Sequence, residues 1–370
     1  TILSLIVTKL VEIDVHIPKD ELNRLESNTN VEIENIFPID VDGERIQVDP
    51  EKMEVEVFSR TLDICLRRIF MYMKTTCHDS DGNLIWENTK SLYHDLISVF
   101  ESEILPTYNS SHVQYIIYYF LSFKITLCEN FCNWLWKKCC DVSFPSTLRQ
   151  AAAGYLASFV CRAPFVSNRV LKNILSNISS WCINYINRVD KTVRVVTENL
   201  LRCHAVFYSI CQSLFYIISF RHQDLMEGKR NLKFMENLNL SKIVICRLSP
   251  LRLCCSAVVN RFAYITKTYQ LTYCYVVMDG HIRVTDQSVK DKLYSFFPFD
   301  TYVLPRSKDI IMSDLYRRFN DDTKKHTNID DEDEDKELSF DDNMDISQNM
   351  SSTSSPTKTD WLELLVNQHQ

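Results

Sequence analysis

Cysteine is the residue type through which this chain could do the most chemistry, because thiolates ligate metals and act as nucleophiles. The chain has 14 cysteines. The closest spacings are one pair separated by three residues and two adjacent pairs, namely Cys128 and Cys132, Cys139-Cys140 and Cys254-Cys255. These spacings differ from the two-residue knuckle of many zinc sites. Since the cysteines lie in apolar, helix-like stretches of a long chain without a signal peptide, we expect free, buried thiols of a reducing compartment.

Other catalytic arrangements are also missing from the sequence. His204 lies beside Cys203 and could be a ligand or a base, but no partner for it can be predicted, and a core position explains it as well. The acidic run 330–335 could attract divalent cations weakly, although such runs are usually solvated. No glycine-rich phosphate loop and no serine nucleophile elbow is present. We therefore expect no enzyme activity, no cofactor and no metal.

Glycine usage narrows the class of fold. The chain has 370 residues and only five glycines, whereas average composition would give roughly five times as many. Folds of the α/β type use glycine at strand-to-helix turns and in phosphate loops. Scarce glycine, with prolines at segment borders, favours helices joined by short loops.

Apolar residues recur with the period of a helix. The first clear case is residues 58–69, where Phe58, Leu62, Cys65 and Ile69 define one face. Pro145 suits the first turn of a helix over 146–163, and Pro164 ends it. Trp181 and Tyr185 continue the apolar face of the helix that follows. The other helical stretches that we expect are 1–13, 89–105, 110–139, 194–226 (central, because it is apolar nearly all round), 231–247 and 251–278, with 269–277 equally compatible with an extended chain.

The sequence thus predicts an all-α fold. Amphipathic helices recurring at roughly 20-residue intervals are typical of paired-helix repeats of the HEAT type. We expect a helical-repeat body over 1–320, an α-solenoid interrupted by an acidic inserted loop at 26–54, and a disordered acidic, serine-rich tail over 321–370. Because residues 1–13 already read as helix, we expect the natural N-terminus to lie further upstream. Two apolar stretches, 111–128 and 203–220, contain polar residues and are interpreted as buried helices, with no membrane span.

The charge is unevenly distributed. The net charge is −7, but residues 26–54 carry −7, 321–345 carry −9 and 346–370 carry −1, which leaves +10 for the other 291 residues. A cationic body with acidic appendages suits work in the nucleus among polymerases and nucleic acid, including a weak contact with DNA. The appendages could equally serve only to neutralise the body and keep it soluble.

Six ordered blocks resemble one known family, the growth-regulated RNA polymerase I-specific transcription initiation factors. The blocks are KSLYHDLISVFESEILPTYNSSHVQYIIYYFLSFK (90–124), LWKKCCD (135–141), LRQAAAGYLASFVCRAPFV (148–166), FYSICQSLFYIISFRH (207–222), LSPLRLCCSAVVNRFAYITKTYQL (248–271) and FFPFDTYVLPRS (296–307). The order, the spacing and the acidic segment after the last block also fit. The resemblance spans about 85–310 firmly and the whole chain loosely.

The resemblance implies a function without catalysis. Members are HEAT-repeat-like α-solenoids that bind the stalk of RNA polymerase I and hold it in an initiation-competent form. They bridge it to promoter-bound core or selectivity factors at ribosomal RNA genes, in the nucleus and nucleolus, under the control of phosphorylation. A homodimer is a further possible state.

Polar residues within the matched blocks are the candidates for partner contacts, although each could instead be solvated or form a local ion pair. These candidates are Lys137, Lys138, Arg149, Gln150, Ser158, Arg162 and Arg221. Phe297, Phe299 and Asp300 are expected to lock the end of the solenoid, with partner docking as the alternative.

Four serines are candidates for phosphorylation. Ser110 and Ser111 follow Pro106, where they would be ordinary helix N-caps or regulatory phosphoacceptors. Ser339 lies in an acidic context that suits acid-directed kinases, and Ser355 precedes a proline. A phosphate adds about −1.5 to −2 charge, which would weaken docking of a cationic body.

Two function classes compete with a polymerase I recruitment factor. A generic nuclear helical-repeat adaptor or scaffold would recover other partners and leave ribosomal RNA synthesis unchanged on depletion. Direct nucleic-acid binding would depend on the cationic body and would be sensitive to salt.

Overall fold

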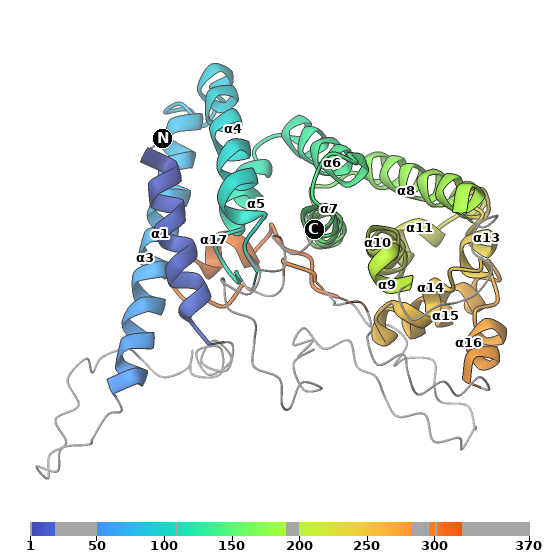
Figure 1. Cartoon of the computed structure of the whole chain (residues 1–370). Coiled ribbons are helices and arrows are strands. Elements are labelled where there is room, and N and C mark those ends of the chain that lie inside the picture. Colours follow the sequence, from blue (N-terminus) through green and yellow to red (C-terminus); the bar gives the residue numbers. More distant parts are fainter. Residues whose placement is uncertain are drawn as a thin grey trace, which may run out of the picture.

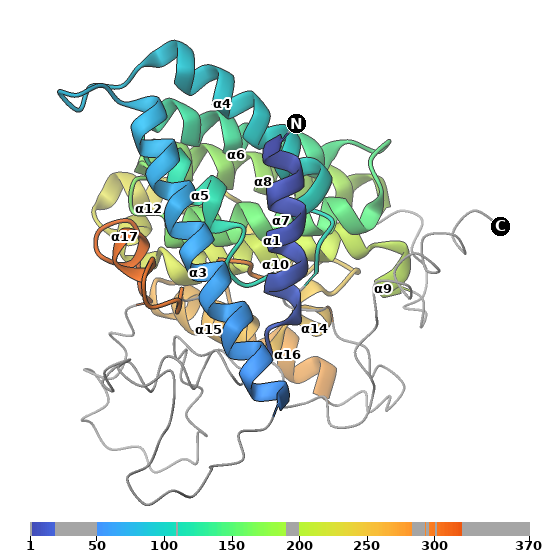
Figure 2. The ribbon, with the colours of Figure 1, turned by 90° about the vertical axis from the view of Figure 1, so that its left-hand side faces the viewer.

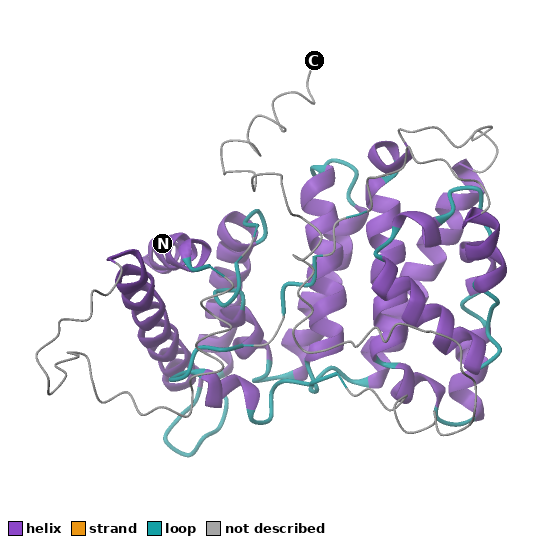
Figure 3. Ribbon diagram, turned by 90° about the horizontal axis from the view of Figure 1, so that it is seen from below, coloured by secondary structure: helices purple, strands orange, loops and turns teal. Residues whose placement is uncertain are grey.

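The structure is a computed structural model, and it describes residues 2–18, 50–108, 110–189, 200–282, 293, 296–299 and 302–319. Within these residues every regular element is a helix, and the nearest approach to a strand is an isolated bridge between His78 and Leu84 (Figure 3). The all-α fold class predicted from glycine scarcity and helical periodicity is confirmed.

The described residues form helices throughout the chain. The first half contains α1 (Ile2–His16), α3 (Pro50–Cys77), α4 (Trp86–Val99), the π-helix η1 (Phe100–Ile104), α5 (Tyr115–Leu121) and α6 (Ile125–Cys140). The second half contains α7 (Ser146–Arg162), α8 (Asn168–Val189), α9 (Leu200–Cys203), α10 (Ala205–Phe220), α11 (His222–Met226), α12 (Lys229–Glu236), α13 (Leu240–Val244), α14 (Pro250–Leu253), α15 (Ser256–Thr268), α16 (Tyr275–Ile282) and α17 (Lys308–Met312).

The helices are arranged in an elongated array. In Figure 1, α1 and α3 form one end, α13 to α16 form the other, and α7 and α10 lie between them. Figure 2, which views the array from the side of α1 and α3, shows these two helices crossing in front of the rest. An array built in this way presents long outer surfaces to solvent, as helical-repeat proteins do.

The centre of the core is the pair α7 and α10, which pack against each other along their length. Residues 152–162 of α7 are all buried, and α10 is buried from 210 to 220. Such helices are apolar on every side because both neighbours and the covering segments remove them from water. The predicted central position of the apolar stretch 194–226 is confirmed for α10. No helix of the described residues has both the length and the apolar character that a bilayer crossing requires.

A segment near the C-terminus of the described chain crosses the array. It comprises residues 293, 296–299 and 302–319, and we call it the return segment (orange in Figure 1). The amide of Leu293 bonds to the carbonyl of Leu253 at one end of the array, at 2.8 Å. Further along, the segment reaches α3 through Asp63, at the other end. The return segment therefore contacts both halves of the molecule.

Several element boundaries differ from the predicted ones. The expected helix 110–139 is broken into α5 and α6, because Lys124 adopts an extended backbone conformation between them. The expected loop 26–54 ends earlier, since α3 begins at Pro50, where a proline without an N–H is favourable. Residues 19–49 and the predicted tail 321–370 lie outside the described part of the chain.

The C-terminal elements are also shorter than predicted. The stretch 231–247 holds two short helices, α12 and α13, because Asn239 between them takes a left-handed conformation with φ 50°. The stretch 251–278 is divided among three helices, α14, α15 and α16. The ambiguous 269–277 is a loop up to Cys274 and helical from Tyr275.

Candidate interaction surfaces

A buried carboxylate joins α1 to the segment that precedes α5. Oδ2 of Asp14 accepts the amide N–H groups of Ser111, His112 and Val113 at 2.8–3.0 Å, and it accepts the hydroxyl of Ser110 at 2.8 Å. Oδ1 lies 3.0 Å from Nδ1 of His112. Burial by itself raises the pKa of Asp14, but the hydrogen bonds and charge of His112 outweigh it and hold that pKa below its ordinary value.

The prediction that Ser110 is a phosphoacceptor or an ordinary helix N-cap is contradicted by its position in this junction. Its side chain is buried, and its hydroxyl bonds to both Asp14 and Gln114. A phosphate there would be forced against a buried carboxylate, so Ser110 is not an accessible phosphoacceptor in this fold. It is not an ordinary N-cap either, because Asp14 from another helix caps these amides. Ser111 is half-buried and remains a candidate, whereas Ser339 and Ser355 lie outside the described residues.

The middle of the return segment is held against α5, α7 and α10. The side-chain amide of Gln114 donates to the carbonyl of Pro298 at 2.6 Å, and the amide of Phe299 donates to the hydroxyl of Ser158 at 3.0 Å. Phe297 stacks on Tyr216, with 3.9 Å between the ring centroids.

Two of the predicted contact residues are therefore internal. Ser158 and Phe299 are fully buried and bond to each other, so neither can meet a partner in this fold. Phe297 and Phe299 pack at the centre of the array, against α10 and α7. We predicted that they would lock its end. Asp300 lies outside the described residues.

The far part of the return segment is held by Asp63 of α3. Its two carboxylate oxygens accept the amides of Arg306 and Ser307 at 2.8 and 2.9 Å, and one of them also accepts the Ser307 hydroxyl. Asp63 is buried. Sequence reasoning missed both Asp14 and Asp63, although an isolated acid on the apolar face of a helix is a signal that could have identified them.

Arg162 and Arg221 are also corrected from surface contacts to internal ones. Arg221 is buried and donates to Asp224, to the carbonyl of Val160 and to Asn168. The guanidinium of Arg162, also buried, stacks over the rings of Phe220 and Tyr316. Both arginines tie α7 to neighbouring elements, which explains why they lie in otherwise apolar sequence.

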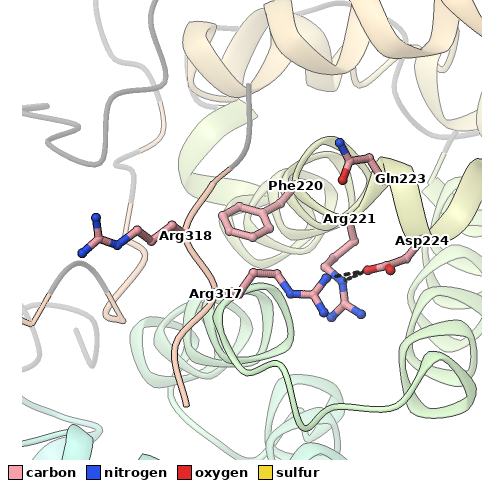
Figure 4. Close-up of a pocket in the computed structure, with 6 residues that line it drawn as sticks. All are labelled: Phe220, Arg221, Gln223, Asp224, Arg317 and Arg318. Atoms are coloured by element: carbon pink, nitrogen blue, oxygen red, sulfur yellow. Dashed lines mark hydrogen bonds and ion pairs between the residues drawn. The ribbon is translucent and has the colours of Figure 1, made fainter. Parts of the chain in front are cut away.

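A pocket of about 370 Å³ lies where the return segment meets the end of α10 and α11. Figure 4 shows Arg221 and Arg317 side by side with Asp224 next to them, while Arg318 leaves the chain in the opposite direction. The carboxylate of Asp224 accepts Nε–H of Arg221 at 2.6 Å and an Nη–H of Arg317 at 2.5 Å. The described residues that line the pocket are Phe220, Arg221, Gln223, Asp224, Arg317 and Arg318.

The predicted contact residues that remain near the surface lie at the C-terminal end of α6 and in the first turn of α7. Lys137 is exposed. Lys138 forms an ion pair with Glu101 and lies 4.6 Å from the ring centroid of Phe144, so much of its charge is used internally. Arg149 donates to the carbonyl of Cys139 at 2.9 Å, and Gln150 accepts from Ser209 at 3.3 Å; both are half-buried.

A second exposed cationic surface, on α3, was not predicted. The buried face of α3 includes Leu62, Leu66 and Phe70, and it is rotated from the predicted one, of which Cys65 and Ile69 are only half-buried. On the opposite side the helix exposes a row of basic and apolar side chains, Val57, Arg60, Arg67, Arg68, Met71, Tyr72 and Lys74. The sequence signal was the spacing of the arginines, which places them on one face.

Most of the cysteines are buried, but Cys203 is exposed, and Cys65, Cys140, Cys255 and His204 are half-buried. All 14 cysteines are free thiols. Burial raises the pKa of Cys140 to about 11 and that of Cys161 to about 12, which keeps both thiols protonated. Nδ1 of His204 lies 2.8 Å from the hydroxyl of Tyr185, and burial lowers the pKa of His204. Across the described residues, no three histidine, cysteine or acidic side chains come together as metal ligands would.

The described residues form an α-helical array with exposed basic side chains on α3 and α6. Residues 1–324 match the model of the family described as RNA polymerase I specific transcription initiation factor RRN3. The chain belongs to this family, as its six ordered sequence blocks predicted.

Curated relatives and a solved structure agree with this assignment. The chain is 34% identical over 372 residues to the mouse RNA polymerase I-specific transcription initiation factor RRN3, a match covering 90% of this chain and 56% of the mouse protein. It is 27% identical over 304 residues to the Schizosaccharomyces pombe protein rrn3, covering 80% of this chain and 48% of that protein. The chain thus spans about half the length of these relatives.

The fold is similar to a crystal structure of RNA polymerase I transcription initiation factor Rrn3. The TM-score is 0.64 at 20% sequence identity, and the match covers 86% of this chain and 61% of that chain. At this identity the likeness supports the fold alone. The predicted helical-repeat type of fold is confirmed at that level.

Proposed function

We propose that this protein is a transcription initiation factor of RNA polymerase I. In this role it binds the polymerase at its stalk and links it to promoter-bound core or selectivity factors at ribosomal RNA genes, in the nucleus and nucleolus. The family match over residues 1–324 is the observation that carries the proposal.

The geometry supports a role in binding. The buried polar residues Asp14, Asp63 and Arg221 are each occupied by bonds that hold separate elements together. What remains for partners is the outer wall of the array, where basic side chains of α3 and α6 are exposed. A cationic wall favours association with acidic surfaces and accelerates their encounter.

The outer face of α6 is our proposed polymerase-contacting surface. Asn130, Asn133 and Lys137 are exposed at helical spacing, so they form one stripe along the helix. Lys138 and Arg149 flank the end of this stripe and are anchored by internal bonds. Because the backbone of α6 is fixed by its packing on α7, this stripe is presented rigidly.

Charge reversal at Lys137 tests the proposed surface. The wild-type chain, added to nuclear extract, should recover RNA polymerase I subunits, and Lys137→Glu should reduce recovery about tenfold, as expected for losing one charge-assisted contact and adding a repulsive charge. Lys138 is left intact because its ion pair with Glu101 supports the fold.

The matched control is Lys233→Glu, the same change at an exposed lysine of α12 in the other half of the array. It should leave recovery unchanged. Equal recovery with both variants would move the contact off α6. A wild-type pull-down that contains other partners and no polymerase I would favour the helical-repeat adaptor instead.

Two further possible partners need separate measurements. Gel-shift titration with promoter DNA at low and moderate salt tests a direct, weak DNA contact. Sedimentation equilibrium over a concentration series tests a homodimer. Both assays use the purified chain without polymerase, so neither outcome depends on the pull-down.

A further inference from the structure

The solvent side of α3 carries a line of apolar side chains. Val57 and Met71 are each 54% exposed, and Ile64, midway between them, is half-buried. Residues seven apart return to nearly the same face of a helix, so these three form a stripe of about 21 Å along α3. We call it the apolar stripe. In Figure 2, α3 lies across the near side of the array, next to α1, on which it packs.

A row of basic side chains runs beside the apolar stripe. Arg60, Arg67 and Lys74 are exposed, and each follows a member of the stripe by three residues. Three residues turn an α-helix by about 300°, which places this basic row about 60° to one side of the stripe. The return segment adds Arg306, whose amide donates to Asp63 and whose carbonyl accepts an Nη–H of Arg67. Its side chain is exposed, so two distant parts of the chain contribute to the positive charge.

The charge of the basic row is not cancelled within the described structure. Between residues 55 and 77, α3 has two acids, of which Glu56 is exposed and Asp63 is buried and bonded to amides of the return segment. Among the ion pairs of the described residues, none involves Arg60, Arg67 or Lys74. An occupant of this face therefore has to supply negative charge together with apolar surface.

Two kinds of occupant do not meet this requirement. A second copy of the same face would bring like charges together, which opposes association. Nucleic acid would pair its phosphates with the arginines, but its charged backbone has no apolar surface to cover Val57 and Met71. The combination points to a protein.

The acidic segments of this chain itself do not match the stripe. Residues 329–338, IDDEDEDKEL, contain only two apolar side chains in ten. Residues 361–366, WLELLV, are apolar around Glu363, but six residues of helix extend only about 9 Å. The apolar stripe is more than twice as long, so the occupant is a longer segment of another protein.

We propose that this face of α3 binds an acidic amphipathic helix of a partner protein. Apolar side chains at helical spacing on the partner cover the apolar stripe, and acids on one flank meet the basic row. About 14 residues, or roughly four turns, match the length of the stripe. The face is separate from the outer surface of α6, so the proposal is independent of the proposed function.

Fluorescence anisotropy with the full chain and a labelled synthetic peptide tests the chemistry of the face. The peptide consists of three repeats of LEALEQA, which places leucines on one side of a helix and glutamates beside them. Binding should weaken as salt is raised. Met71→Glu and Arg60→Glu should each weaken it about tenfold, since the first puts a repelling charge into the stripe and the second reverses a charge of the basic row. Both side chains are exposed, so both variants keep the fold.

The matched controls are Ile245→Glu, directly after α13, and Arg230→Glu, on α12, which make the same changes at exposed positions in the other half of the array. Each should change the affinity less than about twofold. A peptide with lysine in place of every glutamate should not bind. Equal losses with the controls, or equal binding of the lysine peptide, would overturn the assignment of binding to α3.

Photo-cross-linking in cells identifies the natural occupant. With p-benzoylphenylalanine in place of Met71, the product should contain a segment of another protein in which apolar and acidic residues recur at helical spacing. The same replacement of Ile245 is the control and should not capture that segment. A cross-link to nucleic acid, to a second copy of this chain or to its residues 361–366 would contradict the proposal, and so would the absence of any cross-link.

Discussion

At the scale of single residues, two buried acids determine how distant parts of the chain meet. Asp14 caps the segment before α5, and Asp63 caps the residues of the return segment that precede α17. Each satisfies several backbone N–H groups that would otherwise be buried without acceptors, which costs more than an average hydrogen bond. These residues bear on the integrity of the array and not on contact with partners.

Replacing Asp14 with asparagine should destabilise the protein by about 3 kcal/mol at pH 7, because it removes the charge from a buried pair while keeping its shape. The pKa of Asp14 in the folded protein is depressed. Its stabilising contribution is therefore present above the ordinary carboxyl pKa of about 4 and is lost as pH falls through the lower pKa of the folded state. Urea unfolding of wild type and variant at pH 7 and pH 3 measures this.

The expected result is a gap in the free energy of unfolding between wild type and Asp14→Asn that narrows at pH 3. Asp95→Asn, at an exposed position of α4, is the control and should match wild type at both values. A gap that does not depend on pH would show that the charge of Asp14 is unimportant.

Some residue positions could be predicted from the local sequence and others could not. Lys137 was correctly expected at the surface, because it lies opposite the apolar side of a recognisable helix. Ser158 and Arg162 were expected there too, and they are buried. The segment that covers Ser158 comes 141 residues later in the chain, so the local period around 158 contains no information about it.

At the scale of elements, the close contact between α7 and the return segment depends on a glycine. A Cβ at Gly154 would lie 2.5 Å from the carbonyl oxygen of Phe296 and 3.0 Å from its ring. The side chain is absent at 154 because another backbone passes there, and this explains one of the five glycines of the chain.

Gly154→Ala should lower the free energy of unfolding by about 1–3 kcal/mol, because backbone atoms would have to move. Helix propensity alone has the opposite sign, and would stabilise the alanine variant by up to about 1 kcal/mol. Chemical denaturation of the two proteins decides between them. A more stable alanine variant would contradict the packing of residue 296 on α7.

Asp63→Asn should release the part of the return segment that directly precedes α17. The amides of Arg306 and Ser307 should exchange hydrogen about tenfold faster or more, since each loses a bond to a charged acceptor. Native-state hydrogen exchange measures this, with Asp309→Asn on the exposed side of α17 as the control. Unchanged exchange at both amides would show that Asp63 does not hold the segment.

Elements were predictable from sequence where local signals mark them. Pro145 and Pro164 bracket α7, and its predicted range of 146–163 is within one residue of the observed helix. The break between α5 and α6 was not predicted, because residues 122–124 carry neither proline nor glycine. Lys124, at the break, lies 4.3 Å from the ring centroid of Trp86.

At the scale of the whole molecule, the return segment makes the array more than a row of neighbouring helices. In simple solenoids each repeat contacts only the next one. Here one segment bonds to Gln114, Ser158 and Asp63, which lie on three different helical regions. We expect this segment to fix the relative positions of the two ends, so that surfaces on both can act together.

We propose that the protein serves initiation by RNA polymerase I. Rapid depletion of the protein from cells, followed by pulse labelling of new RNA, tests it most directly. Precursor ribosomal RNA should fall within minutes, while messenger RNA and transfer RNA synthesis continue, and re-expression of the wild-type protein should restore it. Unchanged labelling of precursor ribosomal RNA after depletion would contradict the account.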